Sequence, residues 1–271
     1  MSLLILVFIL LGLFVGSFLN VCIDRLPQGQ SIINPPSHCA ACNRKLSILD
    51  LIPVFSYIWL RGRCRYCQAH IPLRLPVVEG ITALMFALLY WKFGLGVELG
   101  ISIVYACLLV VIFVIDLENQ LVLNKITYPA MVLAFALSFF WPGSREVDGL
   151  GAGVINQAVS SVAGEAVGGA VLSLAGGALG LIAMALPFII YPSGMGFGDV
   201  KLGALVGLMT GYPLVIIALL LSWIGGGLVA AILLALKIKS RKDPIPSATF
   251  MAVSALVTLL WGQVIWQWYL F

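Results

Sequence analysis

Eight stretches of the chain, one of them short, consist almost entirely of apolar residues that follow one another without alternation. They cover residues 3–22, 77–93, 99–115, 125–141, 166–190, 200–210, 212–236 and 248–269. Continuous runs of this kind are typical of helices that cross a bilayer, whereas membrane β-strands alternate apolar and polar residues. Hydrophobic residues make up 62% of the chain and charged residues only 10%, which excludes an ordinary soluble domain. We therefore expect an all-α polytopic membrane protein with about eight transmembrane helices.

The positions of the basic residues predict how these helices are oriented. Seven lysines and arginines fall between residues 24 and 75, and four fall between residues 237 and 242. Both regions should be cytoplasmic, because cytoplasmic loops carry an excess of basic residues. Eight spans satisfy this condition if the N-terminus lies outside, and they do so only if the short stretch 200–210 is included. The net charge of +4 then reflects the basic residues of the cytoplasmic loops, and it does not indicate nucleic-acid binding.

The predicted cytoplasmic loop 24–76 carries two Cys-x-x-Cys pairs, Cys39/Cys42 and Cys64/Cys67, with 21 residues between them. This spacing is typical of zinc-ribbon sites, in which four thiolates hold one structural zinc ion. Disulfides are the alternative, but the inferred cytoplasmic side is reducing. We therefore expect three parts: a first transmembrane helix (1–23), a small zinc-ribbon-like domain (24–76) and a transmembrane core (77–271). The stretch 142–165, rich in glycine, serine and alanine, reads as a flexible outer connection.

Two aspartates are the main candidates for chemistry. Asp116 ends the third apolar stretch, and Asp199 begins the sixth within the sequence Gly-Met-Gly-Phe-Gly-Asp. The predicted topology places both on the membrane face that carries the cysteine loop. Two neighbouring carboxyls can share a proton, so that one activates water as a base and the other polarises a carbonyl as an acid. Gly196 and Gly198 would let an extended substrate backbone approach Asp199 closely.

Three other readings of these residues stay open at this point. Paired carboxylates in a membrane also carry protons or cations, so an ion-coupled transporter is one alternative, although no internal repeat is evident. An intramembrane protease for unrelated substrates is a second. A methyltransferase without protease activity is a third, and it would need a nucleotide site built at the membrane surface because the chain has no glycine-rich soluble nucleotide-binding fold. Glu79, near the start of the second stretch, could cap its helix or face a polar cavity.

The chain resembles the type IV prepilin peptidases, and the resemblance runs over nearly its whole length. The order and spacing of several short motifs carry it. They are residues 16–21 (Gly-Ser-Phe-Leu-Asn-Val) with 25–27 (Arg-Leu-Pro), the two cysteine pairs, residues 60–64 (Leu-Arg-Gly-Arg-Cys), residues 74–79 (Arg-Leu-Pro-Val-Val-Glu), Asp116, residues 194–202 (Gly-Met-Gly-Phe-Gly-Asp-Val-Lys-Leu) and residues 244–246 (Pro-Ile-Pro).

The resemblance implies two activities at the cytoplasmic face of the bacterial inner membrane. The first is cleavage of the leader from type IV prepilins and pseudopilins, with Asp116 and Asp199 as the catalytic pair. The second is methylation of the new N-terminus with S-adenosylmethionine. In the family this second activity is linked to the cysteine domain and to the neighbouring arginine/glutamate motif, which here contains Arg74 and Glu79.

The chain departs from the family pattern at three places. Asn124 stands where members commonly have an aspartate, which favours Asp116 as the first catalytic residue. The first cysteine pair lacks the usual proline, but it keeps both thiols. Ser247 and Ala248 stand where Phe-Gly is usual after the Pro-x-Pro motif.

Overall fold

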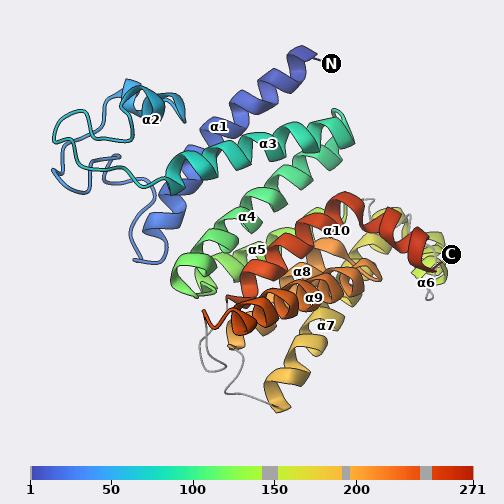
Figure 1. Ribbon diagram of the computed structural model, residues 1–271. Coiled ribbons are helices and arrows are strands. Elements are labelled where there is room, and N and C mark those ends of the chain that lie inside the picture. The colour runs from blue at the N-terminus through green and yellow to red at the C-terminus, as the bar shows by residue number, and fades with distance from the viewer. Residues whose placement is uncertain (1, 142–151, 191–195, 239–245, 271) are drawn as a thin grey trace. The chain divides into compact units, whose positions relative to one another are not determined.

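The computed structural model describes residues 2–141, 152–190, 196–238 and 246–270 (Figure 1). Gly194 and Met195 of the glycine-rich motif and Pro244 and Ile245 of the Pro-x-Pro motif lie outside these described residues. The described chain is helical, and each of the eight apolar stretches forms a helix. The helices are α1 (Ser2–Arg25), η1 (Ile48–Leu51), α2 (Phe55–Trp59), α3 (Arg74–Phe93), α4 (Val97–Asn119), α5 (Asn124–Ser138), α6 (Ala152–Ala163), α7 (Glu165–Ile190), α8 (Phe197–Thr210), α9 (Leu214–Ala235) and α10 (Ser247–Leu270).

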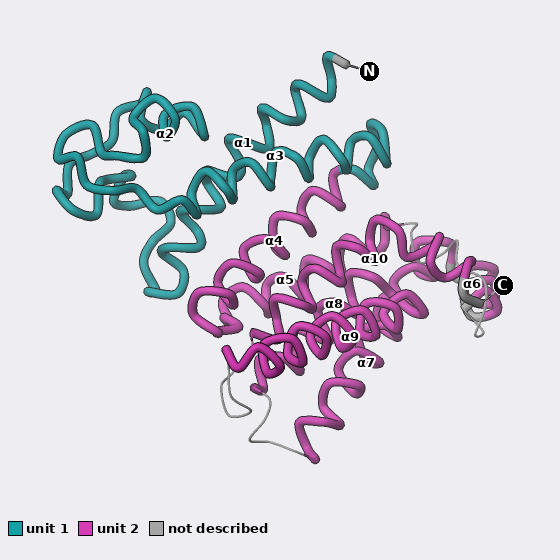
Figure 2. Tube along the Cα trace, viewed as in Figure 1, with its two compact units in different colours: residues 1–99 teal, residues 100–271 magenta. Residues whose placement is uncertain are grey.

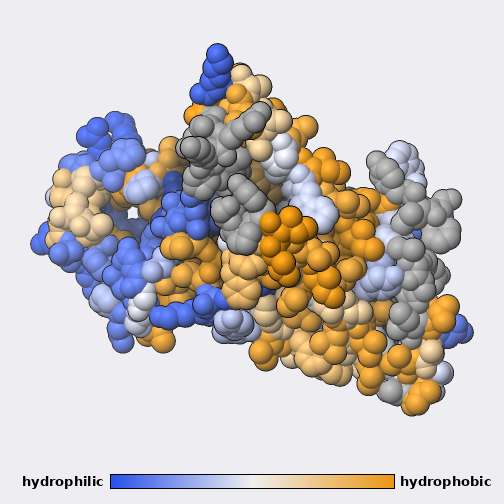
Figure 3. All heavy atoms as spheres, turned by 90° about the horizontal axis from the view of Figure 1, so that it is seen from below, coloured by the Kyte–Doolittle hydropathy of each residue, from blue (hydrophilic) through white to orange (hydrophobic). Residues whose placement is uncertain are grey.

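Six of these helices are long and apolar enough to cross a membrane: α1, α3, α4, α7, α9 and α10. Figure 3 shows broad hydrophobic areas on the molecular surface, which a soluble protein would bury and a bilayer would cover. The predicted all-α polytopic fold is confirmed. The two remaining predicted spans form shorter helices, α5 with 15 residues and α8 with 14. The expectation of a flexible connection over 142–165 is wrong for its second half, since residues 152–163 form α6.

The chain divides into two compact units, residues 1–99 and 100–271 (Figure 2). In the first unit α1 packs along α3. Two glycines of α1 permit this close contact: a Cβ added at Gly12 would lie 2.6 Å from the Cα of Ala83, and one added at Gly16 would lie 2.8 Å from the Cα of Glu79. Small residues at such crossings let helix backbones approach each other in a membrane.

The second unit is built around α8, which contacts α5, α7, α9 and α10. Gly176 and Gly180 of α7 face Gly203 and Gly207 of α8, and the backbones meet where these residues lack side chains. The hydroxyl of Ser173 also donates to the carbonyl of Leu208, 2.7 Å away. The short helix α8 is thereby held at the centre of the second unit. Its first turn carries the carboxylate of Asp199.

Candidate active site and metal centre

The last turns of α4 and the first turn of α8 place the two aspartates of the sequence analysis in the second unit. Both carboxylates are buried, with 4% of Asp116 and 7% of Asp199 exposed. They are near enough for the negative charge of Asp116 to repel that of Asp199. Asp199 lies in the first turn of α8, where the helix dipole favours a negative charge, whereas Asp116 lies near the C-terminal end of α4, where the dipole opposes one.

The first turn of α10 supplies donors to both carboxylates. The backbone N–H of Thr249 lies 2.7 Å from Oδ2 of Asp116, and the Thr249 hydroxyl donates to the same oxygen at 3.0 Å. The backbone N–H of Ala248 also donates to Asp116. The hydroxyl of Ser247 and the backbone N–H of Gly196 hydrogen-bond to Asp199. The N-terminus of α10 therefore offsets the unfavourable position of Asp116 at the end of α4.

Sequence reasoning did not include Ser247 and Thr249 among the site residues. The available signal was their position: two hydroxyl residues follow a Pro-x-Pro motif and open an apolar helix, which is the pattern of a helix N-terminus. What could not be read from the sequence is that this N-terminus would point at the aspartates of two other helices.

The two glycines of the Asp199 motif differ in their surroundings. A Cβ added at Gly198 would lie 2.8 Å from the Cβ of Val122, in the segment between α4 and α5, so this glycine is needed for close packing. A Cβ added at Gly196 would meet its nearest atoms at 3.9 Å, which is ordinary contact. Nearby, the Asn124 side-chain oxygen accepts a hydrogen bond from Lys201 Nζ at 2.8 Å. Asparagine thus provides at this position an acceptor without a negative charge.

In the first unit the four cysteines of the two pairs come together, and all four sulfurs lie within 4.8 Å of one another. Cys39 Sγ and Cys67 Sγ are 3.8 Å apart. Four thiolates at about 2.3 Å from one tetrahedral zinc ion would be separated by about 3.8 Å. The cluster therefore has dimensions that fit a metal ion of this kind, and its members are free cysteines.

The two cysteine pairs are built alike, as expected for two arms of one metal site. The backbone N–H of Asn43 donates to the carbonyl of Cys39, and that of Gln68 donates to the carbonyl of Cys64. Asn43 and Gln68 both have positive φ, 54° and 60°. Each turn thereby folds back so that both of its thiols face the same point. Backbone N–H groups of Cys42 and Ala41 lower the pKa of Cys39 to about 7, which favours the thiolate that binds metal.

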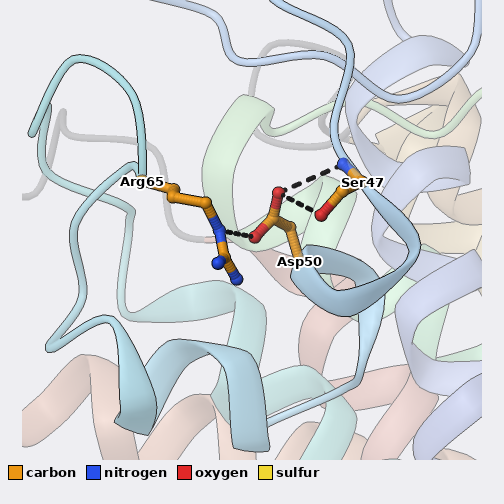
Figure 4. A network of polar contacts seen from close by, with 3 residues as sticks. All are labelled: Ser47, Asp50 and Arg65. Atoms are coloured by element: carbon orange, nitrogen blue, oxygen red, sulfur yellow. Dashed lines mark hydrogen bonds and ion pairs between the residues drawn. The ribbon is translucent and has the colours of Figure 1, made fainter.

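A polar network ties the second cysteine pair to the rest of its loop (Figure 4). Arg65 Nε lies 2.7 Å from Oδ1 of Asp50, while the backbone N–H and hydroxyl of Ser47 donate to Oδ2 at 3.1 and 2.7 Å. Burial acts to raise the pKa of Asp50, but the hydrogen bonds from Ser47 and Arg65 outweigh it and hold this pKa below its ordinary value. Although Arg65 follows Cys64 directly in the sequence, its side chain pairs with Asp50.

The arginine and glutamate of the 74–79 motif connect different parts of the first unit: Arg74 joins α3 to α1, and Glu79 joins α3 to the cysteine loop. Arg74 forms an ion pair with Asp24 at the end of α1. Glu79 is 7% exposed and accepts the backbone N–H of Val54 at 2.7 Å, as well as a hydrogen bond from Ser17.

Two protein-family models match the chain, one within each of the two units. The model of the bacterial peptidase A24 N-terminal domain matches residues 10–93, and that of the type IV leader peptidase family matches residues 103–231. A prepilin leader peptidase/N-methyltransferase of Aeromonas hydrophila is 32% identical over 287 residues, covering 96% of this chain and 92% of the relative. The chain belongs to the type IV leader peptidase family.

Other members with the same name are similar over almost their full length. The Bacillus subtilis protein is 30% identical, covering 96% of this chain and 95% of its own, and the Pseudomonas putida protein is 30% identical, covering 94% and 90%. No solved structure matches the chain. Family membership makes the protein a membrane peptidase, and it gives no support to the alternative of an ion-coupled transporter.

Proposed function

We propose that this peptidase cleaves the leader from type IV prepilins and pseudopilins and then methylates the exposed N-terminus. The first support for this proposal is that the similar proteins are named prepilin leader peptidase/N-methyltransferase. The observation that carries the cleavage reaction is the buried pair Asp116 and Asp199, brought from two helices to one helix N-terminus. A buried carboxylate pair with dedicated donors has the chemistry of an aspartic endopeptidase.

In this mechanism the two aspartates share one proton because like charges at short range do not both ionise. The ionised carboxylate removes a proton from water while the water oxygen forms a bond to the scissile carbonyl carbon. The protonated carboxyl gives its proton to the carbonyl oxygen. The tetrahedral intermediate then collapses: its C–N bond breaks, and the amine nitrogen takes the proton that the first carboxyl removed from water. A hydroxyl of the intermediate returns its proton to the second carboxylate, and the leader leaves with a new carboxyl group. One water is consumed for each bond cleaved.

The test is cleavage of a purified prepilin by the enzyme in detergent or liposomes, read by mass spectrometry. Asp116→Asn and Asp199→Asn should each abolish cleavage while the helical circular dichroism stays that of the wild type. Glu118→Gln is the matched control, because Glu118 is an exposed carboxylate only two residues from Asp116, and it should cleave normally. Full cleavage by either aspartate variant would overturn the aspartic mechanism.

For methylation, we propose that S-adenosylmethionine binds in the first unit beside Arg74 and Glu79. These two residues are already engaged by protein groups, so they would shape the site rather than lie open to the cofactor. Close to them, Asn20 donates to the carbonyl of Leu75 at 3.0 Å, and its side-chain oxygen is buried with no hydrogen-bond partner among the described residues. That oxygen offers an acceptor that suits the ammonium group of the cofactor. When bound, S-adenosylmethionine would supply the methyl group.

Adding S-adenosylmethionine to the cleavage assay separates the two activities, because methylation adds about 14 Da to the mature pilin. Asn20→Leu should reduce the affinity for S-adenosylmethionine in equilibrium binding and leave leader cleavage intact. Unchanged cofactor binding by this variant would refute the assignment of Asn20.

The four cysteines are proposed to hold one structural zinc ion, which would stabilise a loop too small to build a large core of its own. The fit of the sulfur positions to a tetrahedral site supports this. Protein purified under reducing conditions should contain one zinc per chain. The double variant Cys39→Ser with Cys64→Ser should lose the metal and increase hydrogen exchange over residues 24–76 only, which would also test the predicted boundaries of that domain. Wild-type protein without zinc would contradict the proposal.

The proposed location is the bacterial inner membrane, with the aspartates and the cysteine loop on the cytoplasmic side. The support is the distribution of basic residues described above. A membrane-impermeant reagent should modify a cysteine introduced at Gln68 only after the inner membrane is opened, and modification in intact spheroplasts would reverse the topology.

A further inference from the structure

The two carboxylates of the site receive unequal sets of donors. Asp116 accepts two backbone N–H groups, from Ala248 and Thr249, and one hydroxyl, from Thr249. Asp199 accepts one backbone N–H, from Gly196, and interacts with the hydroxyl of Ser247. Of these contacts, Thr249 delivers both of its donors to one oxygen, Oδ2 of Asp116.

This inequality matters because a backbone N–H can only donate. An oxygen that receives an N–H and a hydroxyl together has its lone pairs occupied, and adding a proton to it would displace a donor. Hydrogen bonds from fixed donors favour the charged form of a carboxylate. At Asp116 the positive end of the α10 dipole offsets the negative end of α4, while Asp199 has the positive end of α8. The dipoles therefore do not favour Asp116 over Asp199, and the hydrogen-bond donors distinguish the two carboxylates. The hydroxyl of Ser247 is different, since it can rotate and either donate to an ionised carboxylate or accept from a protonated one.

We infer that Thr249 fixes Asp116 as the ionised member of the pair, and hence as the base, while Asp199 carries the shared proton with Ser247 as its adaptable partner. The inference rests on the proposed aspartic mechanism and assigns roles within it. Thr249 is a positioning residue: it acts through Asp116 and not on the substrate.

The assignment gives each step a definite atom. Oδ1 of Asp116, which lies outside the Thr249 contacts, takes the proton from water as the water oxygen bonds to the carbonyl carbon. Asp199 delivers its proton to the carbonyl oxygen. As Asp199 becomes ionised, the Ser247 hydroxyl turns to donate to it.

The pH dependence of kcat/KM for prepilin cleavage tests the assignment, because its acid limb reports protonation of the base. Thr249→Val removes the hydroxyl and keeps both the side-chain shape and the backbone N–H. One hydrogen bond to a charged group is worth about 1.5–3 kcal/mol, which corresponds to roughly one to two pH units. We expect the acid limb to move to higher pH by about that amount, with the basic limb unchanged, and Thr249→Ser to restore the wild-type profile.

The same helix offers a matched control. Thr258 is also buried in α10, and its hydroxyl has no hydrogen-bond partner among the described residues, so Thr258→Val should leave both limbs in place. Ser247→Ala should move the basic limb alone, because it removes the contact to Asp199.

The possible outcomes distinguish a failure of the base assignment from a failure of the proposed peptidase function. If Asp116→Asn and Asp199→Asn are inactive but Thr249→Val shifts neither limb, the base assignment fails and the aspartic mechanism stands. If Thr249→Val moves the basic limb, the two roles are reversed. A fall in kcat at every pH without a shift would mean that Thr249 only supports the fold, which also overturns the inference. Cleavage by Asp116→Asn would refute the proposed function itself.

Discussion

The glycine contact between α7 and α8 predicts that one added methyl group far from the aspartates will impair the enzyme. A Cβ added at Gly207 would lie 2.5 Å from the carbonyl carbon of Gly176 and 2.9 Å from the Cα of Gly177. Both are backbone atoms, which cannot rotate away as a side chain could. Carbon atoms settle at about 3.5–4.0 Å, so the Gly207→Ala variant must separate the helices by about 1 Å.

Separating α7 from α8 should lower the stability of the protein moderately and its cleavage rate strongly. Overpacking of this kind typically costs about 1–3 kcal/mol of stability. Asp199 lies eight residues along the same helix, about 12 Å away at 1.5 Å per residue, so a shift of α8 displaces its carboxylate relative to Asp116. A misplacement of about 1 Å can reduce catalysis by roughly 100-fold. We therefore expect a moderately destabilised protein that has lost most of its cleavage rate.

The assay compares thermal unfolding in detergent micelles with the rate of prepilin cleavage, measured well below the unfolding temperature. Gly227→Ala is the control, because Gly227 lies in α9 with nothing within 4 Å of an added Cβ. That variant should cleave normally and be as stable as the wild type, or more stable by up to about 1 kcal/mol from helix propensity. If Gly207→Ala unfolds and cleaves like the wild type, the close contact of α7 and α8 does not set the position of Asp199.

Other predictions concern residues around the two sites. Gly198→Ala should destabilise the protein by about 1–3 kcal/mol through its clash with the loop after α4, whereas Gly196→Ala has room and should fold normally; full cleavage by Gly196→Ala, measured by mass spectrometry, would count against a role in substrate approach. The pKa of Asp50 is lowered in the folded loop, so its contribution to stability is present above about pH 4 and is lost as pH falls further. Asp50→Asn should therefore increase hydrogen exchange of the loop at pH 7, and the difference from the wild type should persist down to about pH 4 and shrink only below it; equal exchange at pH 7 would refute this. Asn124→Asp should pair with Lys201, add at most about 1 kcal/mol in thermal unfolding and leave the pH profile of cleavage unchanged; a new titration in that profile would place residue 124 in the dyad.

Much of this arrangement follows from patterns that the sequence displays directly. Long apolar runs predict helices, because a bilayer offers no water to the backbone. The N–H and C=O groups must therefore hydrogen-bond to each other. Charge distribution predicted that Asp116 and Asp199 share a membrane face, which stays a prediction; the structure places both carboxylates beside the N-terminus of α10. The cysteine spacing predicted a common site because a Cys-x-x-Cys turn presents both thiols to one point.

The contacts that the sequence did not reveal are those between distant segments through single polar groups. Thr249 donates to Asp116 across 133 positions of the chain, and Val54 donates its backbone N–H to Glu79. A backbone donor has no residue signature, so the sequence does not show which group it will contact. Arg65 has a signature, its charge, but several acidic residues could have been its partner. The helix α6 was missed because its glycine, serine and alanine were read as loop formers, although Val154, Val159 and Val162 follow a helical spacing.

The shortness of α5 and α8 has a consequence for where this enzyme works best. With 15 and 14 residues they extend about 22 and 21 Å, against a hydrocarbon thickness of about 30 Å. The two helices contact each other, so the deficit is concentrated at one place in the bundle. Lipid must thin there or water must enter, each at a cost of fractions of a kcal/mol per Å of mismatch. Hydrolysis needs water at buried carboxylates, and a locally thin membrane shortens its path. Cleavage should therefore be faster in bilayers of short acyl chains than in thick ones.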